Sequence, residues 1–356
     1  MYYRIVGMSH TPSDKSAPTA YCTPEGARSR AVSGDHTDLS APGAGPGSSR
    51  SSVTSTTKDS LRVSRIPPRR IALCGGGMLG ISHTGFIKAL HEEGLLGHVR
   101  EVIGISAGCI CAIGMVIGYT VKEMEEIAMY FNFEAMRNIS PENFLNFPFT
   151  FGLDDGERLE SFIISLLHQK GFPPDITFEE LHKKCPIHFR CFATETQTSR
   201  LREFSTKATP KTMIRFAIRA SMALPFVFTP VKEPGGALLI DGGILNNLPL
   251  VFMTPAEVAE TWCVFFTDAS STESQAVSSL SDMFQLVYNS LVLMKTSPFL
   301  KTFQDRIIRV PVDLKKCLNY DMCSEEKKAL VDLTYQYTRK FLFTQTRKPP
   351  RRFSAS

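Results

Sequence analysis

The stretch EVIGISAG at residues 101–108 decides the fold, because a run of β-branched residues leads directly into a Gly-x-Ser-x-Gly motif. Its first five residues predict a short buried strand, and the apolar run at 107–119 predicts the helix that follows. Gly104 and Gly108 permit the sharp, crowded turn that such a strand–helix junction requires. We therefore predict that Ser106 lies at a helix N-terminus, where the helix dipole favours developing negative charge. The alternative is a tight packing turn that carries no chemistry.

A second glycine-rich turn, GGGMLG at Gly75–Gly80, follows the short apolar segment RIALC at Arg70–Cys74. Three consecutive glycines leave backbone N–H groups unshielded at the start of a helix predicted at 79–93, which is typical of an anion site. The anion is either a pyrophosphate or the oxyanion of an acyl transfer. Dinucleotide binding needs an acidic residue at the far end of the next strand. Glu101 lies at the start of that strand and Ser106 follows its far end, so acyl transfer is favoured.

The segment ALLIDGG at residues 237–243 places Asp241 at the end of another short strand. Taken alone, Asp-Gly after a strand is also typical of a type I′ or II′ hairpin turn. All eight histidines lie at or before His188, so none follows Asp241 as the chain order of a hydrolase triad requires. The residues therefore favour a Ser106–Asp241 pair. Triads built from earlier residues are the alternative: Asp154 or Asp155 with His168, His182 or His188.

Short apolar strands alternate with helices from Arg70 onward. This alternation predicts a three-layer α/β/α fold with a mostly parallel central sheet and with ligands at the carboxyl ends of its strands. The three glycine-rich turns all follow such strand ends. The predicted strands are 70–74, 101–105, 187–194, 200–204, 237–240, 262–267 and 306–310. The predicted helices are 79–93, 107–119, 121–130, 157–168, 178–184, 210–220, 280–295 and 324–341.

Four segments are predicted along the chain. Residues 1–66 are rich in Ser, Thr, Pro, Gly and Ala without apolar periodicity, which predicts a disordered low-complexity segment. The α/β domain is expected at 67–268, a helical extension packing on it at 269–343, and a basic flexible tail at 344–356.

Composition narrows the class of protein further. Of the 356 residues, 43% are hydrophobic, and the net charge of +5 is too weak to indicate nucleic acid as a partner, although it suits an anionic membrane surface. Nine cysteines without CxxC spacing predict reduced, buried thiols rather than a zinc site. No signal peptide is recognised. The most apolar window, 102–119, is Gly-rich and contains Ser106, so we interpret it as a buried strand and helix and not as a membrane span. We expect a cytoplasmic protein, peripherally membrane-associated.

Two further clusters have alternative interpretations. Six phenylalanines between residues 131 and 151 form either an acyl-chain pocket or interfacial lid, or core packing under a long loop. Basic residues lie at Arg69–Arg70 and Lys348–Arg352. They attract the protein to anionic membranes, form a nuclear localisation signal, or are solvated charges with neither role.

The ordered motifs GGGMLG, GISAG and DGG resemble the patatin-like phospholipase family. Three connecting segments resemble the same family: FATETQTSR at 192–200, SMALPFVFTPV at 221–231 and ILNNLP at 244–249. The resemblance covers about residues 70–267. It implies that Ser106 is the nucleophile, Asp241 its general base, and the backbone N–H groups of the glycine loop the oxyanion hole. The loop residues are Gly75, Gly76, Gly77 and Met78, and the other motif glycines are Gly80, Gly104, Gly108, Gly242 and Gly243.

The resemblance implies a lipid acyl hydrolase of phospholipase A or lysophospholipase type, acting through an acyl-serine intermediate without metal or organic cofactor. For Asp241 to act as a base, we expect an enclosed apolar site that raises its pKa. The alternatives are a neutral-lipid or small-ester hydrolase with the same pair, and a catalytically silent lipid-binding scaffold.

Overall fold

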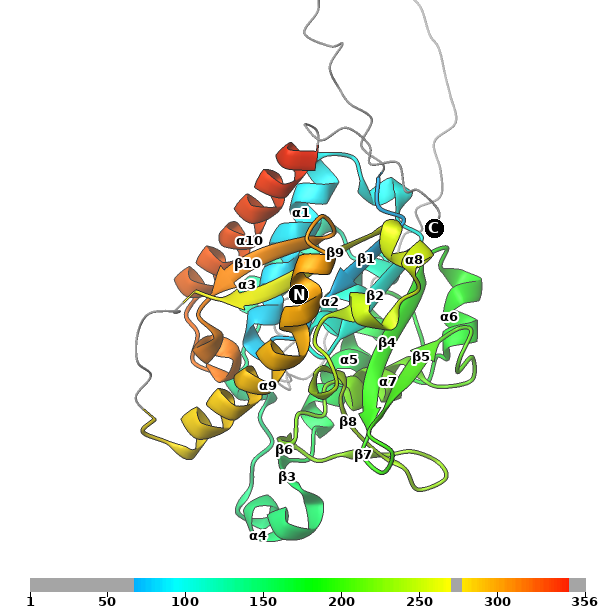
Figure 1. Ribbon diagram of the computed structural model, residues 1–356. Coiled ribbons are helices and arrows are strands. Elements are labelled where there is room, and N and C mark those ends of the chain that lie inside the picture. Colours follow the sequence, from blue (N-terminus) through cyan, green and yellow to red (C-terminus); the bar gives the residue numbers. More distant parts are fainter. Residues whose placement is uncertain (1–66, 270–276, 346–356) are drawn as a thin grey trace, which may run out of the picture. The chain divides into compact units, whose positions relative to one another are not determined.

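The computed structural model of the chain describes residues 67–269 and 277–345 (Figure 1). The segment predicted to be disordered at 1–66, and residues 346–356 of the predicted basic tail, lie outside the described residues. Thr344 and Gln345, which we assigned to the tail, belong instead to the last helix, α10 (Ser324–Gln345).

Eight strands form the main sheet in the order β10-β9-β1-β2-β4-β8-β7, and β5 pairs with β4 outside this path. The strands from β10 to β4 run parallel, whereas β5, β8 and β7 pair antiparallel with their neighbours. The predicted mostly parallel sheet is therefore confirmed. The strands are β1 (Arg70–Leu73), β2 (Glu101–Ile105), β4 (His188–Glu195), β5 (Arg200–Ser205), β7 (Val231–Lys232), β8 (Leu238–Asp241), β9 (Thr261–Asp268) and β10 (Ile307–Val312). A separate parallel pair consists of β3 (Gly152–Asp154) and β6 (Phe226–Phe228).

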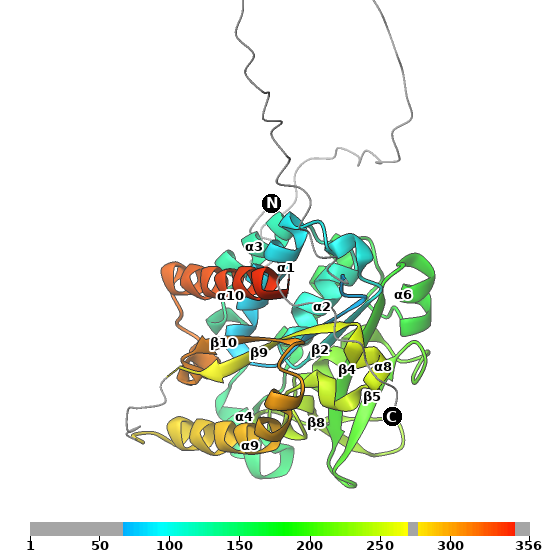
Figure 2. The same ribbon diagram turned by 45° about the horizontal axis from the view of Figure 1, so that its top comes forward.

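Helices cover both faces of the main sheet and complete the three predicted layers (Figure 2). α1 (His83–Glu92) and α10 lie on one side of the sheet, and α9 (Leu280–Thr302) lies on the other. The other α-helices are α2 (Gly108–Val116), α3 (Val121–Tyr130), α4 (Pro141–Thr150), α5 (Glu157–Gln169), α6 (Phe178–Lys184), α7 (Ile214–Ser221) and α8 (Pro255–Ala259). Short 3-10 helices are η2 (Gly77–Ser82), η3 (Leu96–His98), η4 (Glu134–Met136), η5 (Gly242–Ile244), η6 (Pro249–Phe252) and η7 (Leu314–Leu318).

Strand β4 aligns two segments that are far apart in the sequence. β2 pairs with its first part, ending with Ile105 opposite Phe192. β8 pairs with its last part and ends with Asp241 opposite Ala193, while β5 occupies the other edge of β4. Because Phe192 and Ala193 are consecutive, the carboxyl ends of β2 and β8 meet on the same edge of β4. This register brings Ser106, the residue after β2, to the side of Asp241.

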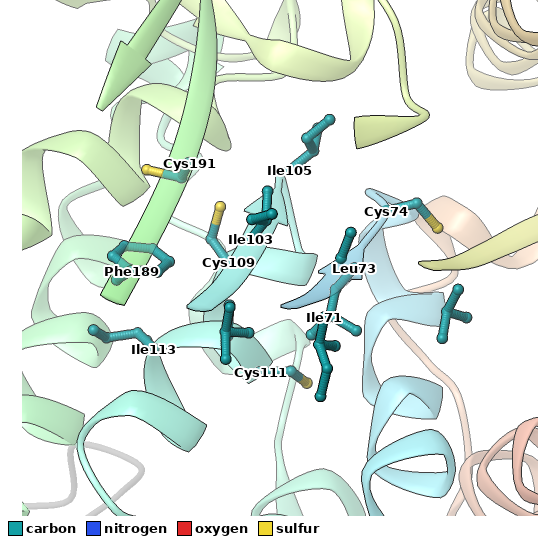
Figure 3. Packing of buried hydrophobic residues seen from close by; sticks show 14 of the residues in the cluster. Ile71, Leu73, Cys74, Ile103, Ile105, Cys109, Cys111, Ile113, Phe189 and Cys191 are labelled. Atoms are coloured by element: carbon teal, nitrogen blue, oxygen red, sulfur yellow. The ribbon is translucent and has the colours of Figure 1, made fainter. Parts of the chain in front are cut away.

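Part of the core lies between the central strands and α2 (Figure 3). Ile71 and Leu73 of β1 and Ile103 and Ile105 of β2 are completely buried. Strands covered on both faces are apolar throughout, which explains why residues 102–119 have the composition of a membrane segment although they form β2 and α2. In the described ranges, no helix is both long enough and apolar enough to cross a membrane.

One helix forms where the sequence predicted an aromatic loop. Ser140 caps α4 by accepting a hydrogen bond from Asn143 N–H at 3.1 Å, and Pro141 occupies the first turn. The sequence signal was hidden because α4 buries none of its residues and therefore has no apolar periodicity toward a core.

The segment after residue 268 is integrated into the main sheet. The strand predicted at 306–310 is confirmed as β10, but it pairs with β9 at the sheet edge, and α10 packs against α1. The boundary predicted at 268 therefore lies within one sheet and one core. The helical extension that we predicted at 269–343 is therefore not separate from the α/β domain but belongs to it, in the residues that the structure describes.

Candidate active site

Ser106 lies between β2 and α2, at the carboxyl end of the parallel strands. Its φ angle of 51° is in the left-handed region, which a non-glycine residue adopts at a cost of about 1–2 kcal/mol. Ser106 N–H donates to Ser221 Oγ at 3.0 Å, so α7 holds the strained turn in place. The observed turn has the backbone geometry that exposes a nucleophile above a sheet.

The predicted motif glycines let backbone segments approach each other around this turn. A Cβ atom on Gly108 would lie 2.5 Å from Leu73 O, so α2 reaches the end of β1 only because that atom is absent. At each of four further motif glycines, a Cβ atom would come within 2.9 Å of a heavy atom from another part of the site: Gly80, Gly104, Gly242 and Gly243.

Asp241 ends β8, and its side chain is almost fully buried. Asp241 Oδ1 accepts a hydrogen bond from Gly243 N–H at 2.7 Å, which starts the 3-10 turn η5. Neither Gly242 nor Gly243 has a positive φ angle. The type I′ or II′ hairpin turn that Asp-Gly alone also indicated is therefore not formed.

Burial raises the pKa of Asp241 to about 6, and smaller opposing effects come from the Ser106 side chain and from Gly243 N–H. The enclosed apolar environment expected from the sequence is present. Asp241 Oδ2 is buried and, among the described residues, accepts no hydrogen bond of normal geometry. The Ser106 hydroxyl thus lies near enough to influence the carboxylate without a regular hydrogen bond. Catalytic groups are often in such loose contact when no substrate is bound.

Three backbone N–H groups of the glycine loop lie beside the same cavity. Gly76, Gly77 and Met78 line the cavity together with Ser106 and Asp241. Within the described part of the chain, no acceptor is present for the N–H groups of these three loop residues. Gly77 has a φ angle of 53°, and a Cβ atom there would lie 2.2 Å from a backbone oxygen of η7, so glycine is required where the loop contacts η7.

Gly75 differs from the other residues of the predicted oxyanion hole. Its N–H donates to Asn247 Oδ1 at 2.7 Å, and its carbonyl accepts a hydrogen bond from Asn247 Nδ2 at 3.0 Å. Because this N–H is already used within the protein, our assignment of Gly75 as an oxyanion donor is corrected. Asn247 instead clamps the loop that carries the three unpaired donors.

For the ester hydrolysis that the sequence resemblance implies, replacing Asn247 with alanine is expected to lower kcat about 10- to 100-fold. The variant leaves the buried N–H and C=O of Gly75 without partners, so the donor loop loses its fixed position. Steady-state kinetics on a soluble ester measures the effect. Asn246→Ala is the matched control, because Asn246 bonds Leu248 and Lys295 but not Gly75. An equal loss in both variants would contradict a specific clamp.

A cavity of about 160 Å³ joins the glycine loop, Ser106 and Asp241 to an apolar interior. Its walls come from α2, α3, α5 and the loop after α3. Side chains that line the apolar part include Ile110, Met124, Phe131, Phe133, Phe162 and Leu166. The apolar lining suits a hydrocarbon chain attached to a carbonyl group near Ser106.

The predicted phenylalanine cluster divides into two groups. Phe131 and Phe133 pack edge-to-face and line the cavity, as expected for an acyl-chain pocket. Phe144, Phe149 and Phe151 are instead exposed on and after α4. Neither the pocket nor the lid interpretation therefore describes the whole cluster.

No histidine among the described residues lines the cavity. His83 is completely buried; its Nε2 lies 2.8 Å from Cys74 O, and burial lowers its pKa to about 4. His182 and His188 stack on each other with 3.8 Å between ring centroids. The predicted alternative triads therefore lack a base at the site.

Asp154 does line the cavity, but both of its oxygens have other partners. They accept hydrogen bonds from the backbone N–H groups of Asn138 at 2.6 Å and Gly156 at 2.8 Å. The Asp155 carboxylate accepts from the Asn138 side chain. These two aspartates thus fix the loop between α3 and α5.

Glu101 lies at the opposite end of β2 from Ser106. It forms ion pairs with Arg70 at 2.8 Å and with Arg190 at 3.0 Å. Glu101, the acidic residue considered for dinucleotide binding, therefore does not lie at the carboxyl end of β2, as the sequence indicated. Arg70 also pairs with Glu260, so it is not a free basic residue for membrane attraction. The second basic cluster, Lys348–Arg352, lies outside the described residues.

The cysteines of the described ranges act as packing groups. None of these eight forms a disulfide, and all except Cys323 are buried, as predicted. Burial raises the thiol pKa to about 12 for Cys74 and Cys111. In the part of the chain that the structure describes, no three His, Cys, Asp or Glu side chains are grouped to hold a metal ion.

Sequence reasoning missed three residues of the site: Ser221, Asn247 and Tyr288. The first two lie in the segments SMALPF and ILNNLP, whose likeness to family segments could have marked them. Tyr288 of α9 carries no local signal. It lines the cavity, and its hydroxyl is 2.9 Å from where a Cβ atom on Gly243 would stand. Burial, and to a lesser extent the charge of Asp241, raises the pKa of Tyr288.

A serine on a strained strand–helix turn, at the carboxyl edge of a mostly parallel sheet and beside a buried carboxylate, is typical of α/β acyl hydrolases. A family model described as patatin-like phospholipase matches residues 71–253, just over half of the chain. The chain belongs to the patatin-like phospholipase family.

Relatives of this chain occur in bacteria and viruses. An uncharacterized protein of Bacillus subtilis is 25% identical over 293 residues, covering 75% of this chain and 96% of that protein. A probable lipid hydrolase of Invertebrate iridescent virus 6 is 24% identical over 188 residues, covering 51% of this chain. The chain spans 62% of the length of this viral relative and of a second, from a mimivirus.

A solved structure supports the fold. VipD from Legionella pneumophila aligns with a TM-score of 0.51 at 18% sequence identity, covering 78% of this chain and 67% of that one. At this identity the likeness concerns architecture alone.

Proposed function

We propose that this protein hydrolyses carboxylic esters of membrane lipids, as a phospholipase A or lysophospholipase, with Ser106 as nucleophile and Asp241 as general base. One observation carries the proposal: the same apolar cavity is lined by Ser106, by the buried Asp241 and by three residues whose backbone N–H groups have no acceptor among the described residues. Membership of the patatin-like phospholipase family supports a lipid ester as the substrate.

The proposed reaction has two half-reactions. Ser106 Oγ attacks the ester carbonyl carbon while its proton passes to Asp241, and the backbone N–H groups of Gly76, Gly77 and Met78 stabilise the oxyanion. The lipid alcohol then leaves with the proton from Asp241, which gives the acyl-serine. Water, deprotonated by Asp241, attacks the acyl-serine carbonyl, and the bond to Ser106 Oγ breaks as that oxygen takes the proton back from Asp241. The fatty acid is released, and Ser106 and Asp241 return to their starting states.

The environment of Asp241 makes a carboxylate usable as a base. A carboxyl group with an ordinary pKa near 4 is a weak proton acceptor at neutral pH, whereas burial brings the pKa of Asp241 to about 6. The raised pKa still leaves the group mostly ionised at pH 7. The backbone N–H donors supply the remaining transition-state stabilisation, and each oxyanion donor typically contributes about 3–4 kcal/mol.

Three substrate preparations test the proposed lipid class: phosphatidylcholine vesicles, lysophosphatidylcholine and triolein emulsion. We expect fatty acid release from a phospholipid or lysophospholipid at least about 10 times faster than from triolein. Mass spectrometry of the products distinguishes release from the two acyl positions. Preference for triolein would support the neutral-lipid alternative, and absence of hydrolysis of all three would favour a lipid-binding scaffold.

A further inference from the structure

Helix α4 projects large apolar side chains into solvent. Phe144, Leu145 and Phe149 are 68%, 75% and 81% exposed, and no residue of α4 is buried. Two phenylalanines beside it, Phe151 and Phe226, are also more than half exposed. A soluble surface exposes single apolar residues routinely, but a contiguous group of this kind indicates a partner.

Helix α9 has an apolar outer face as well. Gln285 and Thr296 mark the side of α9 that is buried against the protein. On the helical wheel, Met283, Val287 and Met294 lie opposite Gln285, and they are 47%, 51% and 72% exposed. A surface helix normally carries polar residues there.

Aromatic contacts join these two helices to the cavity. Phe147 of α4 contacts Phe226 at 6.3 Å between ring centroids, and Phe226 contacts Phe284 of α9 at 5.9 Å. Phe284 stacks on Tyr288 at 6.2 Å, and both line the catalytic cavity. We call the exposed side chains of α4, Phe151, Phe226 and the outer stripe of α9 the apolar face. The apolar face is thus continuous with the wall of the cavity. Figure 2 shows α4 and α9 toward the same end of the view.

Backbone strain provides independent evidence that this exposure is functional. Phe151 and Phe226 have φ angles of 60° and 66°, where glycine or asparagine is favoured. Both side chains are exposed, so neither strain is offset by burial in the core. At Phe151 and Phe226 the chain therefore has a solvent-exposed phenylalanine although the positive φ angle disfavours any residue with a large side chain.

We infer that the apolar face inserts into the interfacial region of a phospholipid bilayer and aligns the cavity with its substrate. The inference rests on the proposed function, because a water-insoluble ester must pass from the bilayer into a cavity that this face borders. Charge agrees with it: after Asp282, α9 contains Lys295 and Lys301, both exposed, and no acidic residue. Phenylalanine and leucine with flanking lysines are the composition of interfacial helices.

The test measures binding separately from catalysis. Phe144, Leu145 and Phe149 are changed together to serine in an Ser106→Ala background, and sedimentation with phosphatidylcholine vesicles that contain some phosphatidylserine measures binding. We expect partitioning to fall about tenfold or more. A second variant changes the outer stripe of α9, Met283, Val287 and Met294, to serine. Phe343→Ser is the matched control, because Phe343 is 55% exposed and belongs to α10, which lies on the other side of the sheet from α9.

The same α4 and α9 substitutions with Ser106 intact should leave hydrolysis of a monomeric short-chain ester unchanged and slow hydrolysis of vesicle phospholipid about tenfold or more. Undiminished vesicle binding in both variants would overturn the inference. So would an equal loss in Phe343→Ser, or analytical ultracentrifugation showing that the substitutions only dissociate a dimer. If the proposed function alone is wrong, vesicle binding still depends on the apolar face while ester hydrolysis is absent.

Discussion

Replacing Ser106 with alanine is expected to reduce kcat/KM for ester hydrolysis by at least about 1,000-fold and to abolish covalent labelling by a fluorophosphonate probe. The probe reacts with an activated serine hydroxyl, so it reports on the nucleophile without requiring the natural substrate. Ser165→Ala is the matched control: Ser165 lies on α5, outside the cavity lining, where its hydroxyl donates to Phe162 O at 2.7 Å. This control should be labelled and active like the wild type.

A second substitution at Ser106 distinguishes loss of catalysis from loss of folding, because the backbone conformation there favours glycine. The φ angle of 51° suits glycine better than any residue with a side chain, so Ser106→Gly should be inactive and at least as stable as Ser106→Ala. Persistent labelling of both variants at the wild-type rate would place the nucleophile elsewhere.

Asp241→Asn is expected to have opposite effects on activity and stability. Activity should fall at least about 100-fold, because an amide cannot accept the Ser106 proton. The melting temperature at pH 8 should rise by several degrees, because the variant no longer buries a charge. An increase of the pKa from 3.8 to about 6 corresponds to about 3 kcal/mol of lost stability once the group is ionised. Gly243 N–H retains an acceptor in the asparagine Oδ1 atom.

The pH dependence of the melting temperature shows whether the ionised Asp241 carboxylate destabilises the folded protein. Because the folded-state pKa of Asp241 is raised, the folded protein holds the proton more tightly than the unfolded chain does. The wild type therefore loses this part of its stability as the pH rises from about 4 to about 6, whereas the asparagine variant does not. Differential scanning calorimetry should show the gap in melting temperature widening over that range, while wild-type kcat/KM rises toward a plateau above pH 7. A constant gap, or a variant less stable at pH 8, would contradict a buried ionised base.

Local sequence was sufficient for the features that depend on adjacent residues. β2 and the turn at Ser106 follow from EVIGISAG because strand, glycines and apolar helix are contiguous, and the mostly parallel sheet follows from the alternation of strands and helices. α4 was missed because no core-facing pattern exists in a helix that packs so little. The assignment of Gly75 failed for a related reason: its N–H is satisfied by Asn247, 172 positions away in the chain.

Tertiary packing decided the rest of the candidate site. Tyr288 reaches the cavity only because α9 crosses over the turn that follows β8, and no pattern within α9 specifies this crossing. Likewise, β10 was recognised as a strand, but its position beside β9 depends on pairing between segments that a single sequence does not reveal.

Because β2 and β8 meet on one edge of β4, the distance between Ser106 and Asp241 depends on strand register and can change only in whole-residue steps. Side chains alternate between the two faces of a strand, so a slip of β8 by one position would turn the Asp241 carboxylate to the wrong side of the sheet. A slip by two would carry it one pleat, roughly 7 Å, from Ser106. Insertions in the turn between β4 and β5 therefore leave the site intact as long as the register of β8 is kept. A slip of β8 removes the carboxylate from Ser106 in one step rather than by degrees.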